Sequence, residues 1–383
     1  MNMIEELVLI TIGSPYKVET WSGVPFFFIK ELERKQIKVN VIDLEPNRCI
    51  KIIYNKIILP IMSLFVKPEG LSIYHSIFFR LYQKYLYKIK LPKYKNADAF
   101  IGMAYNLMIP NQTKPVILFS DWPFSYDLRR KKAKIGIYQK QQIVWENRCM
   151  LNASSVISLF PTCAEYINNI LGKKKASSLG INVINNYSSE PDISLMSKKQ
   201  KNKKIVFIGR KHYIQGAVAL LSSYEELKSF FPDLHIDIIG MTRQDMSGFL
   251  KSTYEKDITF WGYLNKGNVE QCKTYYEILS SASLYVNTTP GWVGYTSMIE
   301  AMYFYTPVVV YPCAEFIDEF GNNINFGNYC QNENLLVESI ISILADVNKF
   351  NQFSINAHNR VTEYTWHNFT DRLLAHIKKT MGQ

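Results

Sequence analysis

The amino-acid sequence predicts an α/β protein with two domains, each built on a parallel sheet that helices cover on both faces. The first observation is a series of short, β-branched apolar runs that are continuous rather than alternating, as in strands buried on both faces. The second is that segments of helical spacing separate the runs, which indicates strand–helix–strand units with right-handed crossovers. The third is a polar segment that divides the runs into two groups.

Ten strands are expected, five on each side of the polar segment. They lie at residues 8–12, 39–43, 99–103, 116–119, 156–159, 205–208, 236–239, 258–260, 284–286 and 308–310. Residues 215–231 are an example of the segments between them, with apolar residues at helical spacing.

The polar segment covers residues 188–204, which are charged, contain one proline and offer few apolar side chains to bury. This composition is typical of a linker, and 383 residues are enough for two domains. We therefore expect an amino-terminal domain over residues 1–190, a carboxyl-terminal domain over 200–360 and a final helix within 361–383. Two doubly wound domains that face each other make a cleft, and such sheets bind ligands at the carboxyl ends of their strands.

The composition excludes several classes of protein. Apolar residues make up 47% of the chain, which argues against disorder. The six cysteines are scattered with no Cys-x-x-Cys pair, and the six histidines show no metal-ligand spacing, so neither a zinc site nor a disulfide framework is expected. No secretory signal and no run of about 20 apolar residues is evident. We expect a cytoplasmic protein without a bound metal.

The net charge of +11 is unevenly distributed. Residues 48–95 contain ten Lys or Arg against one acid, Glu69, giving +9, and a second basic run occupies residues 129–134. Because Ile, Leu, Phe and Tyr are interleaved with the bases of residues 48–95, this segment is suited to contact with an anionic membrane surface. An ordinary solvated face is the alternative, and nucleic acid is a less favoured partner.

A nearly uncharged stretch, residues 278–314, has the features of an anion site. Its first strand-like run leads into a turn-rich loop with Gly291 and Gly294, where the backbone can approach a ligand closely. A helix is expected to begin near Thr296 or Ser297, either of which can cap it. The free N–H groups at such a helix start attract an anion.

Glu300 is the only charged residue in that stretch. A carboxylate in an apolar setting must be paired or must accept hydrogen bonds. The two hydroxyls of a ribose are suitable donors. A structural glutamate that local backbone groups satisfy is the alternative.

Residues 205–216 form a second motif, in which a buried strand ends at Gly209 and a basic loop opens a helix. Arg210 and Lys211 in this loop are placed to bind a phosphate. The dinucleotide glycine pattern and the P-loop pattern are both absent. A solvent-facing arginine in a turn is the alternative.

The order FIGR…QG, IDIIG, ITFWGYL and MIEAMYFYTPVVV resembles the carboxyl-terminal domain of family 4 glycosyltransferases, also called group 1. The WSG loop near the amino terminus, the segment ILFSDWP and the final WHNF resemble the same family. The resemblance implies the GT-B fold: two Rossmann-like doubly wound domains facing a cleft, with a carboxyl-terminal helix crossing back to the first domain. It also implies a nucleotide-sugar donor held by the second domain, and metal-independent transfer that usually retains the anomeric configuration.

The resemblance assigns roles to individual residues. It places the donor diphosphate at Arg210, the ribose at Glu300, and the base near Trp261, Gly262 and Tyr263. The helix start formed by Tyr295, Thr296 and Ser297 also contacts the donor. In the first domain, Gly23 lets its loop approach the diphosphate and sugar, and Asp121 lies on the acceptor side of the cleft.

Two positions depart from the family pattern. Gln215 stands where the family has a lysine, and Lys211 is a candidate to supply the lost charge. Trp292 stands where the family tends to have an acid that contacts the donor sugar, and it offers a stacking face instead. These departures leave the donor sugar and the stereochemistry open.

The expected function is transfer of a hexosyl-type sugar from a UDP- or GDP-linked donor to a glycan or lipid-linked acceptor in cell-surface polysaccharide biosynthesis. The reaction is expected to retain configuration and to need no cofactor, with the protein peripheral on the inner face of the membrane. The alternatives are an inverting transferase with Asp121 as the base, a nucleotide-sugar epimerase, and a non-catalytic relative that binds membrane or nucleic acid.

Overall fold

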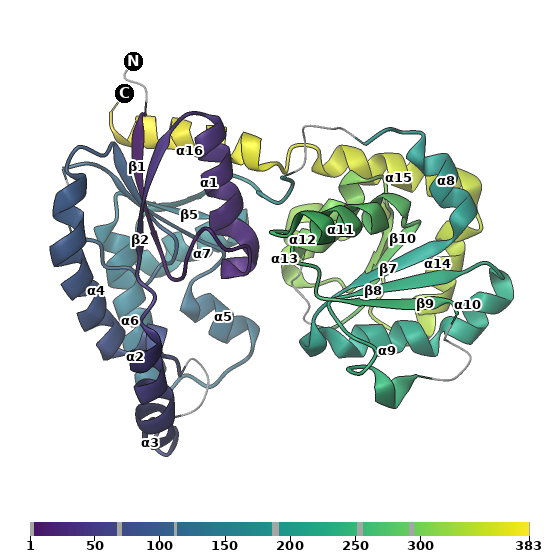
Figure 1. Cartoon of the computed structure of the whole chain (residues 1–383), viewed down its shortest axis with the longest axis horizontal. Coiled ribbons are helices and arrows are strands. Elements are labelled where there is room, and N and C mark those ends of the chain that lie inside the picture. The colour runs from purple at the N-terminus through teal and green to yellow at the C-terminus, as the bar shows by residue number, and fades with distance from the viewer. Residues whose placement is uncertain are drawn as a thin grey trace. The chain divides into compact units, whose positions relative to one another are not determined.

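The computed structural model describes residues 4–66, 71–110, 113–185, 191–250, 256–290 and 295–382, except the side chain of Glu333. The chain divides into two compact units. Unit 1 contains Met1–Asn182 and Trp366–Gln383, and unit 2 contains Val183–Thr365 (Figure 1).

Unit 1 is built on a six-stranded parallel sheet in the order β2-β1-β3-β4-β5-β6. Its strands are β1 Glu6–Thr11, β2 Lys38–Asp43, β3 Ala99–Gly102, β4 Val116–Ser120, β5 Ser155–Ser158 and β6 Ala176–Ser178. The strand order reverses between β1 and β3, so the loops that follow these strands border a ligand-binding position of the doubly wound type.

Helices and helical turns connect the strands of unit 1 (Figure 1). In chain order they are η1 Thr20–Gly23, α1 Val24–Arg34, α2 Arg48–Ile53, η2 Tyr54–Ile58, α3 Leu59–Ser63, η3 Ile73–His75, α4 Ile77–Lys90, η4 Leu91–Tyr94, α5 Phe124–Arg130, α6 Ile137–Asn152, α7 Pro161–Leu171 and α16 Trp366–Thr380.

The last helix, α16, completes unit 1 although it comes from the end of the chain. The Trp366 ring lies 6.0 Å from the Phe28 ring of α1, and the Phe369 ring lies 5.3 Å from the Phe119 ring of β4. The expectation of a final helix that returns to the first domain is therefore confirmed.

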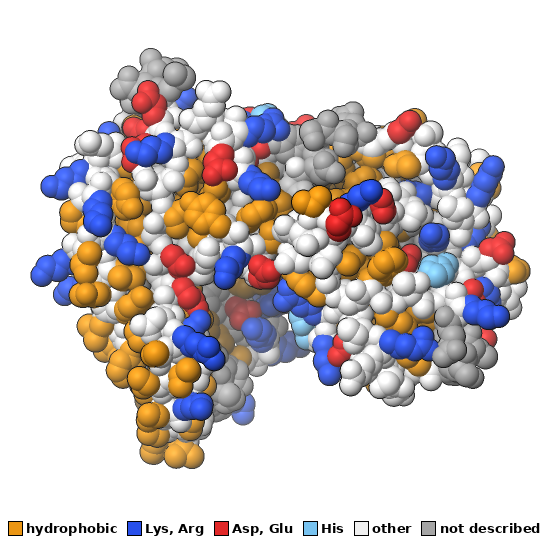
Figure 2. Space-filling view, viewed as in Figure 1, with side chains coloured by type: hydrophobic (Ala, Val, Ile, Leu, Met, Phe, Trp, Pro, Cys, Tyr) orange, Lys and Arg blue, Asp and Glu red, His pale blue; other side chains and the backbone are white. Residues whose placement is uncertain are grey.

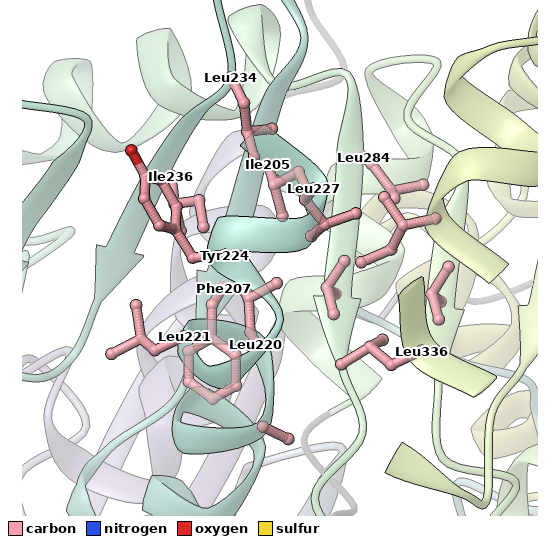
Figure 3. Packing of buried hydrophobic residues seen from close by; sticks show 14 of the residues in the cluster. Ile205, Phe207, Leu220, Leu221, Tyr224, Leu227, Leu234, Ile236, Leu284 and Leu336 are labelled. Atoms are coloured by element: carbon pink, nitrogen blue, oxygen red, sulfur yellow. The ribbon is translucent and has the colours of Figure 1, made fainter. Parts of the chain in front are cut away.

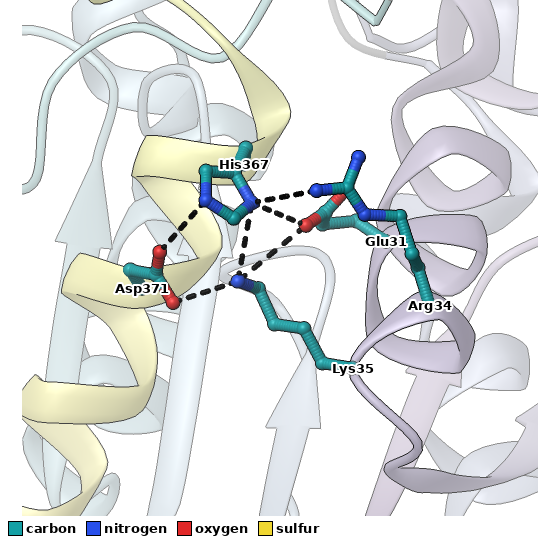
Figure 4. A network of polar contacts seen from close by, with 5 residues as sticks. All are labelled: Glu31, Arg34, Lys35, His367 and Asp371. Carbon is teal, nitrogen blue, oxygen red and sulfur yellow. Dashed lines mark hydrogen bonds and ion pairs between the residues drawn. The ribbon is translucent and has the colours of Figure 1, made fainter. Parts of the chain in front are cut away.

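A polar network at the edge of this contact joins α16 to α1 (Figure 4). His367 Nδ1 lies 2.8 Å from Glu31 Oε1, and Lys35 Nζ donates to Asp371 Oδ1 at 2.7 Å. Arg34 completes the group at 3.5 Å from His367 Nδ1. Because Glu31 is only 4% exposed, its charge needs these partners.

Unit 2 is built on a second six-stranded parallel sheet, in the order β12-β11-β10-β7-β8-β9. Its strands are β7 Lys204–Ile208, β8 His235–Ile239, β9 Ile258–Gly262, β10 Leu284–Asn287, β11 Val308–Val310 and β12 Gly327–Tyr329. The order reverses between β7 and β10, which makes the carboxyl ends of these two strands the expected ligand site.

Helices lie on both faces of the sheet of unit 2 (Figure 1). In chain order they are α8 Leu195–Asn202, η5 Lys211–Tyr213, α9 Ile214–Ser222, α10 Tyr224–Phe230, η6 Ser247–Phe249, α11 Val269–Ser281, α12 Tyr295–Tyr303, α13 Ala314–Phe320, η8 Glu333–Leu335, α14 Leu336–Leu344 and α15 Val347–Val361.

The apolar core of unit 2 lies between the sheet and helices α9, α10 and α14 (Figure 3). Phe207 on β7, Leu220 on α9 and Leu336 on α14 are each fully buried in it. Packing on both faces explains why these strands read as continuous apolar runs. The core fixes the sheet whose carboxyl edge carries the candidate site.

The two sheets confirm the fold class and the ten strands expected from the sequence. Two further strands, β6 and β12, were not expected. The interpretation of residues 188–204 as a linker is wrong in its described second half, because residues 195–202 form helix α8. Met196 and Lys199 of that helix are buried, so the segment packs in spite of its polar composition.

Candidate functional site

Glycines allow the loops at the carboxyl ends of β7, β8 and β9 to pack closely together. Gly240 has φ +97°, and a Cβ there would lie 2.6 Å from the carbonyl oxygen of Gly209. The Gly240 N–H donates to the Gly262 carbonyl at 2.7 Å. A larger residue at position 240 would separate the loops that carry the site.

Arg210 and Tyr263 meet above these glycines. The Arg210 guanidinium lies 4.9 Å from the centroid of the Tyr263 ring, a cation–π distance. Arg210 follows β7 and Tyr263 follows β9, and both side chains are exposed. The structure thus brings together two residues that the sequence assigned to the donor, and it presents a planar cation at the switch point.

The end of β10 lies beside the start of α9. Asn287 Nδ2 donates to the Ile208 carbonyl at 3.1 Å, and Thr289 Oγ1 donates to the Tyr213 carbonyl at 3.2 Å. A Cβ at Gly216 would lie 2.3 Å from Thr289 Oγ1, so glycine is required where α9 touches this loop. Gly216 is the glycine of the QG motif.

Thr288, between Asn287 and Thr289, is 6% exposed. Its hydroxyl has no hydrogen-bond partner among the described residues. Buried hydroxyls are normally satisfied, so Thr288 is a candidate ligand contact at the switch point. The sequence analysis missed it, although the Asn-Thr-Thr-Pro run directly after a buried strand was a signal.

Helix α12 begins earlier than expected. Tyr295, Thr296 and Ser297 all lie inside it, and the Ser297 hydroxyl lies 2.8 Å from the Tyr285 hydroxyl. The expectation that Thr296 or Ser297 caps the helix is therefore wrong, because the helical turn already includes both residues. The preceding Gly291, Trp292 and Gly294 lie outside the described residues.

Glu300, on α12, is 3% exposed and is paired by side chains rather than by local backbone. Lys266 Nζ lies 2.6 Å from each carboxylate oxygen. The Tyr275 hydroxyl donates to Oε2 at 2.8 Å, and the Tyr276 hydroxyl lies 3.4 Å from Oε1. Burial and the neighbouring carboxylate raise the pKa of both tyrosines well above the ordinary value, so both remain donors.

The sequence did not identify these partners. Lys266 lies in the loop after β9, outside the stretch that contains Glu300, and the two tyrosines resemble ordinary apolar positions of α11. Only the packing of α11 against α12 brings them together.

The remaining residues considered in the sequence make contacts of their own. Lys211 points to Asp245, with 3.6 Å between Nζ and Oδ1, and the exposed Gln215 follows on α9. The His212 ring lies 3.9 Å from its neighbour Tyr213. The Trp261 indole N–H donates to Asp237 on β8 at 2.7 Å, which anchors that ring against the sheet.

In unit 1, the loop containing Gly23 contacts Asp121. Trp21, Ser22 and Gly23 have φ of 42°, 54° and 86°, three successive left-handed conformations that cost energy at the two non-glycine residues. This geometry directs the Trp21 indole N–H to Asp121 Oδ2 at 3.1 Å. Burial raises the pKa of Asp121 to about 6, and the Trp21 hydrogen bond opposes that rise.

Two clusters therefore border the switch points of the two sheets. Unit 2 offers Arg210, a helix start and a buried carboxylate, a set suited to a phosphate and a sugar hydroxyl pair. Unit 1 offers a carboxyl group that titrates near neutrality. No group of three or more His, Cys, Asp or Glu with metal-binding geometry occurs within the described part of the chain.

Comparison with known structures shows the class of fold. The fold of the chain is that of solved GT-B structures. Sucrose-phosphate synthase from Thermosynechococcus elongatus superposes with a TM-score of 0.69 at 13% identity, over 99% of each chain. WaaG, described as a glycosyltransferase involved in lipopolysaccharide biosynthesis, gives 0.64 at 10% identity over 98% of this chain and 99% of WaaG. A mutant of S. aureus TarM, solved in complex with fondaparinux, alpha-GlcNAc-glycerol and UDP, gives 0.54 at 16% identity over 76% of this chain and 58% of TarM.

The sequence match is to one family. Residues 192–360, which make up most of unit 2, match the family described as glycosyl transferases group 1. The resemblance inferred from the sequence is confirmed over that range. No curated protein sequence matches the chain.

Proposed function

We propose that the protein is a glycosyltransferase that moves a hexosyl group from a UDP- or GDP-linked sugar to a glycan or lipid-linked acceptor. The observation that carries the proposal is the Arg210–Tyr263 pair at the carboxyl end of β7, beside the strand β10 that precedes α12. This end of the sheet belongs to the region, residues 192–360, that matches group 1 glycosyltransferases. TarM has been solved with UDP, and WaaG is involved in lipopolysaccharide biosynthesis. Both similarities support a nucleotide-sugar donor and a role in cell-surface polysaccharide synthesis.

The proposed chemistry needs no metal or other cofactor. The bond between the anomeric carbon and the diphosphate oxygen breaks, and the acceptor oxygen bonds to that carbon. The diphosphate keeps the electron pair and takes up the proton that the acceptor hydroxyl loses. Arg210 and the N–H groups at the start of α12 stabilise the negative charge that grows on the leaving diphosphate. Glu300 accepts hydrogen bonds from the ribose, and the Tyr263 ring supports the Arg210 guanidinium. We propose retention of configuration.

An inverting reaction is the second candidate, and Asp121 is the observation that favours it. A carboxyl group whose pKa is raised to about 6 suits a general base near neutral pH. The anomeric configuration of the product, determined by NMR, separates the two reactions. A product with the configuration of the donor would exclude Asp121 as the base of a single displacement.

Thermal unfolding with a panel of nucleoside diphosphates and nucleotide sugars tests the donor site. The correct nucleotide at 100 times its dissociation constant adds about 2.7 kcal/mol to the free energy of unfolding. Arg210→Ala is expected to lower kcat/KM by at least about 100-fold, and Arg210→Lys is expected to recover only part of it. EDTA is expected to leave the wild-type rate unchanged.

The matched control is Arg243→Ala, which removes an arginine from the loop after β8 rather than from the end of β7. Near-normal turnover of Arg210→Ala would remove Arg210 from the site. A loss of activity in EDTA that Mn²⁺ or Mg²⁺ restores would contradict the metal-independent reaction.

We propose further that unit 1 binds an anionic membrane surface. The segment from α2 to the end of α3 and the two residues after it exposes a row of apolar side chains, most of all Leu64 at 78% and Phe65 at 83%. The others in this row are Ile52, Ile53, Ile57 and Ile61. Figure 2 shows hydrophobic side chains gathered where Figure 1 places α3.

Helix α4 adds a second exposed apolar face. Phe79, Gln83 and Tyr87 face the core, while Ile77, Phe78, Leu81, Tyr85 and Ile89 are exposed on the opposite face. Lys84 and Lys88 are exposed on that same face. An outer helix face of apolar and basic residues is typical of an interfacial helix. We call residues 48–66 together with 77–95 the basic apolar surface.

The charge of this surface supports lipid as the partner. The described residues between Arg48 and Lys95 include nine Lys or Arg and no Asp or Glu. Each base near an anionic leaflet contributes about 1 kcal/mol. Within the described residues, no helix is both long and apolar enough to cross a bilayer.

Co-sedimentation with vesicles tests this partner. The protein is expected to bind vesicles that contain anionic lipid, to dissociate from them at high salt, and not to bind neutral vesicles. The triple change Lys84→Glu, Lys88→Glu and Lys90→Glu should abolish binding and leave nucleotide binding intact. The same charge change at Lys173, Lys174 and Lys201, outside the basic apolar surface, is the control. Equal binding to neutral vesicles, or no binding to either kind, would mean that the basic apolar surface is an ordinary solvated surface.

A further inference from the structure

Most acceptor positions of the Glu300 carboxylate are already taken. A carboxylate offers about four lone-pair sites. Lys266 Nζ takes one on each oxygen, at 2.6 Å. The Tyr275 hydroxyl takes another on Oε2, while the Tyr276 hydroxyl lies 3.4 Å from Oε1. A ribose that binds Glu300 through both of its hydroxyls needs two positions, so one of the bound donors must leave.

The three side chains around the carboxylate differ in how freely they can move. Tyr275 is 3% exposed within α11. The Tyr276 hydroxyl donates to Asn185 Oδ1 at 2.7 Å, which fixes its position. Lys266 lies in the loop between β9 and α11, is 18% exposed, and reaches Glu300 on a flexible four-carbon stem, with its amino group 4.3 Å from the centroid of the Tyr275 ring. Lys266 is the donor that can move without unpacking a helix.

We propose that Lys266 is a displaceable cap on Glu300, present when no nucleotide is bound and replaced by the ribose hydroxyls of the donor. The inference rests on the proposed function, in which Glu300 binds ribose. In the nucleotide-free chain, the ammonium group supplies the opposite charge that a buried carboxylate requires. When the ribose arrives, its two hydroxyls take the vacated positions, and Lys266 turns toward solvent on its loop.

The cap lowers the apparent affinity for nucleotide. A ligand that binds only the uncapped form shows an affinity reduced by the fraction of that form. Removing the Lys266 amino group should therefore tighten nucleotide binding while it destabilises the free chain. A purely structural ion pair predicts no change in affinity, and a lysine that touches the nucleotide predicts weaker binding. The sign of the affinity change thus separates the three roles.

The experiment measures thermal unfolding and direct binding for the wild type, Lys266→Met, Lys266→Arg and the control Lys273→Met, a lysine 70% exposed on α11. The probes are UDP, GDP and inorganic pyrophosphate, which has the diphosphate without the ribose. Lys266→Met should have the lower melting temperature without ligand, and saturating UDP or GDP should close most of that gap. Its dissociation constant for the bound nucleotide should fall by about tenfold, the equivalent of one charge-assisted hydrogen bond.

Pyrophosphate provides the internal control. Because it has no ribose hydroxyls to replace Lys266, it should bind Lys266→Met and the wild type equally and should leave the stability gap open. Lys266→Arg, which keeps the cap, and Lys273→Met should behave as the wild type. If Lys266→Met fails to fold, Lys266→Gln, which keeps two N–H groups and loses the charge, takes its place.

Two results would overturn the cap. An unchanged affinity, with a stability gap that persists in saturating nucleotide, would make the ion pair structural. A weaker affinity would make Lys266 a direct nucleotide contact. The failure of the proposed function looks different, because then none of UDP, GDP and their sugars stabilises the wild type, and both proposals fall together.

Discussion

At the scale of single residues, Glu146 on α6 is the carboxyl group whose pKa is raised furthest among the described residues. It is 6% exposed, and its Oε2 accepts the Phe124 N–H at 2.7 Å. Burial raises its pKa to about 8, although the Phe124 hydrogen bond favours the charged form. At neutral pH the side chain is thus largely a neutral acid that holds the start of α5.

Glu146→Gln is expected to make the protein more tolerant of alkaline pH. The pKa is higher in the folded chain than in the unfolded chain, so the stabilising contribution is complete below about pH 4.5 and is lost as the pH rises toward 8. Over that window the wild type loses up to about 1.4 kcal/mol per pH unit through this group. The glutamine keeps the acceptor for Phe124 and does not titrate.

Urea unfolding at pH 5 and at pH 8.5 measures this effect. The difference in free energy of unfolding, Glu146→Gln minus wild type, should be larger at pH 8.5 than at pH 5. Glu165→Gln, which changes an exposed glutamate of α7, serves as the control. A difference independent of pH would show that Glu146 is already charged when folded.

Part of the candidate site could be predicted from individual residues of the sequence. Arg210, Gly262 and Tyr263 were assigned to the donor because each follows a recognisable strand, and the structure brings them together at one edge of the sheet. Lys266 could not be found in this way, since its pairing with Glu300 depends on how α11 packs on α12. The helix start was misplaced because the hydroxyls of Thr296 and Ser297 looked like caps.

At the scale of elements, α8 shows how a polar segment becomes part of a fold. Lys199 is fully buried, and burial lowers its pKa well below the ordinary value. Its amino group donates to the Leu279 carbonyl at 3.1 Å, to the Phe304 carbonyl and to Thr306 Oγ1 at 2.7 Å. These carbonyls lie near the ends of α11 and α12, where backbone acceptors lack intrahelical partners. One side chain therefore joins three helices.

Lys199→Met is expected to lower the free energy of unfolding of unit 2 by about 2–5 kcal/mol, because the Leu279 and Phe304 carbonyls lose a charged donor in the interior. Chemical denaturation checks this value. Lys201→Met on the exposed side of the same helix should change stability by less than about 0.5 kcal/mol. Equal effects of the two changes would mean that α8 is not anchored through Lys199.

The elements that the sequence did not predict are short or polar. Strands β6 and β12 have three residues each, Ala176–Ser178 and Gly327–Tyr329, with little apolar content to distinguish them from loops. They form because a neighbouring strand supplies hydrogen-bond partners along the sheet edge. The other ten strands were predicted because burial on both faces leaves a continuous apolar run.

At the scale of the whole molecule, the chain enters unit 2 after Asn182 and returns to unit 1 at Trp366. The first and last residues of unit 2 lie side by side, because the Val183 and Ile184 N–H groups both donate to the Tyr364 carbonyl, at 2.9 and 2.8 Å. Each unit keeps its own sheet and its own switch point, but unit 1 is not continuous in sequence.

A chain that ends at Thr365 is expected to lose the stability of unit 1 and to keep that of unit 2. Removal of α16 exposes Phe28 and Phe119 and leaves Glu31 without His367. Hydrogen exchange of the full-length and shortened chains checks the prediction, with loss of protection expected in residues 4–182 only. Equal protection of unit 1 in both chains would mean that α16 is dispensable.

The position of α16 also has a consequence for how the protein is made. The ribosome completes residues 1–182 long before it reaches Trp366, and at roughly 5–20 residues per second the remaining residues 183–383 take roughly 10–40 seconds to emerge. During that time the nascent first half lacks the helix that covers Phe28 and Phe119. Chaperones that bind exposed aromatic segments on emerging chains therefore have a defined period in which to act on this protein, and that period closes once α16 has emerged and packed.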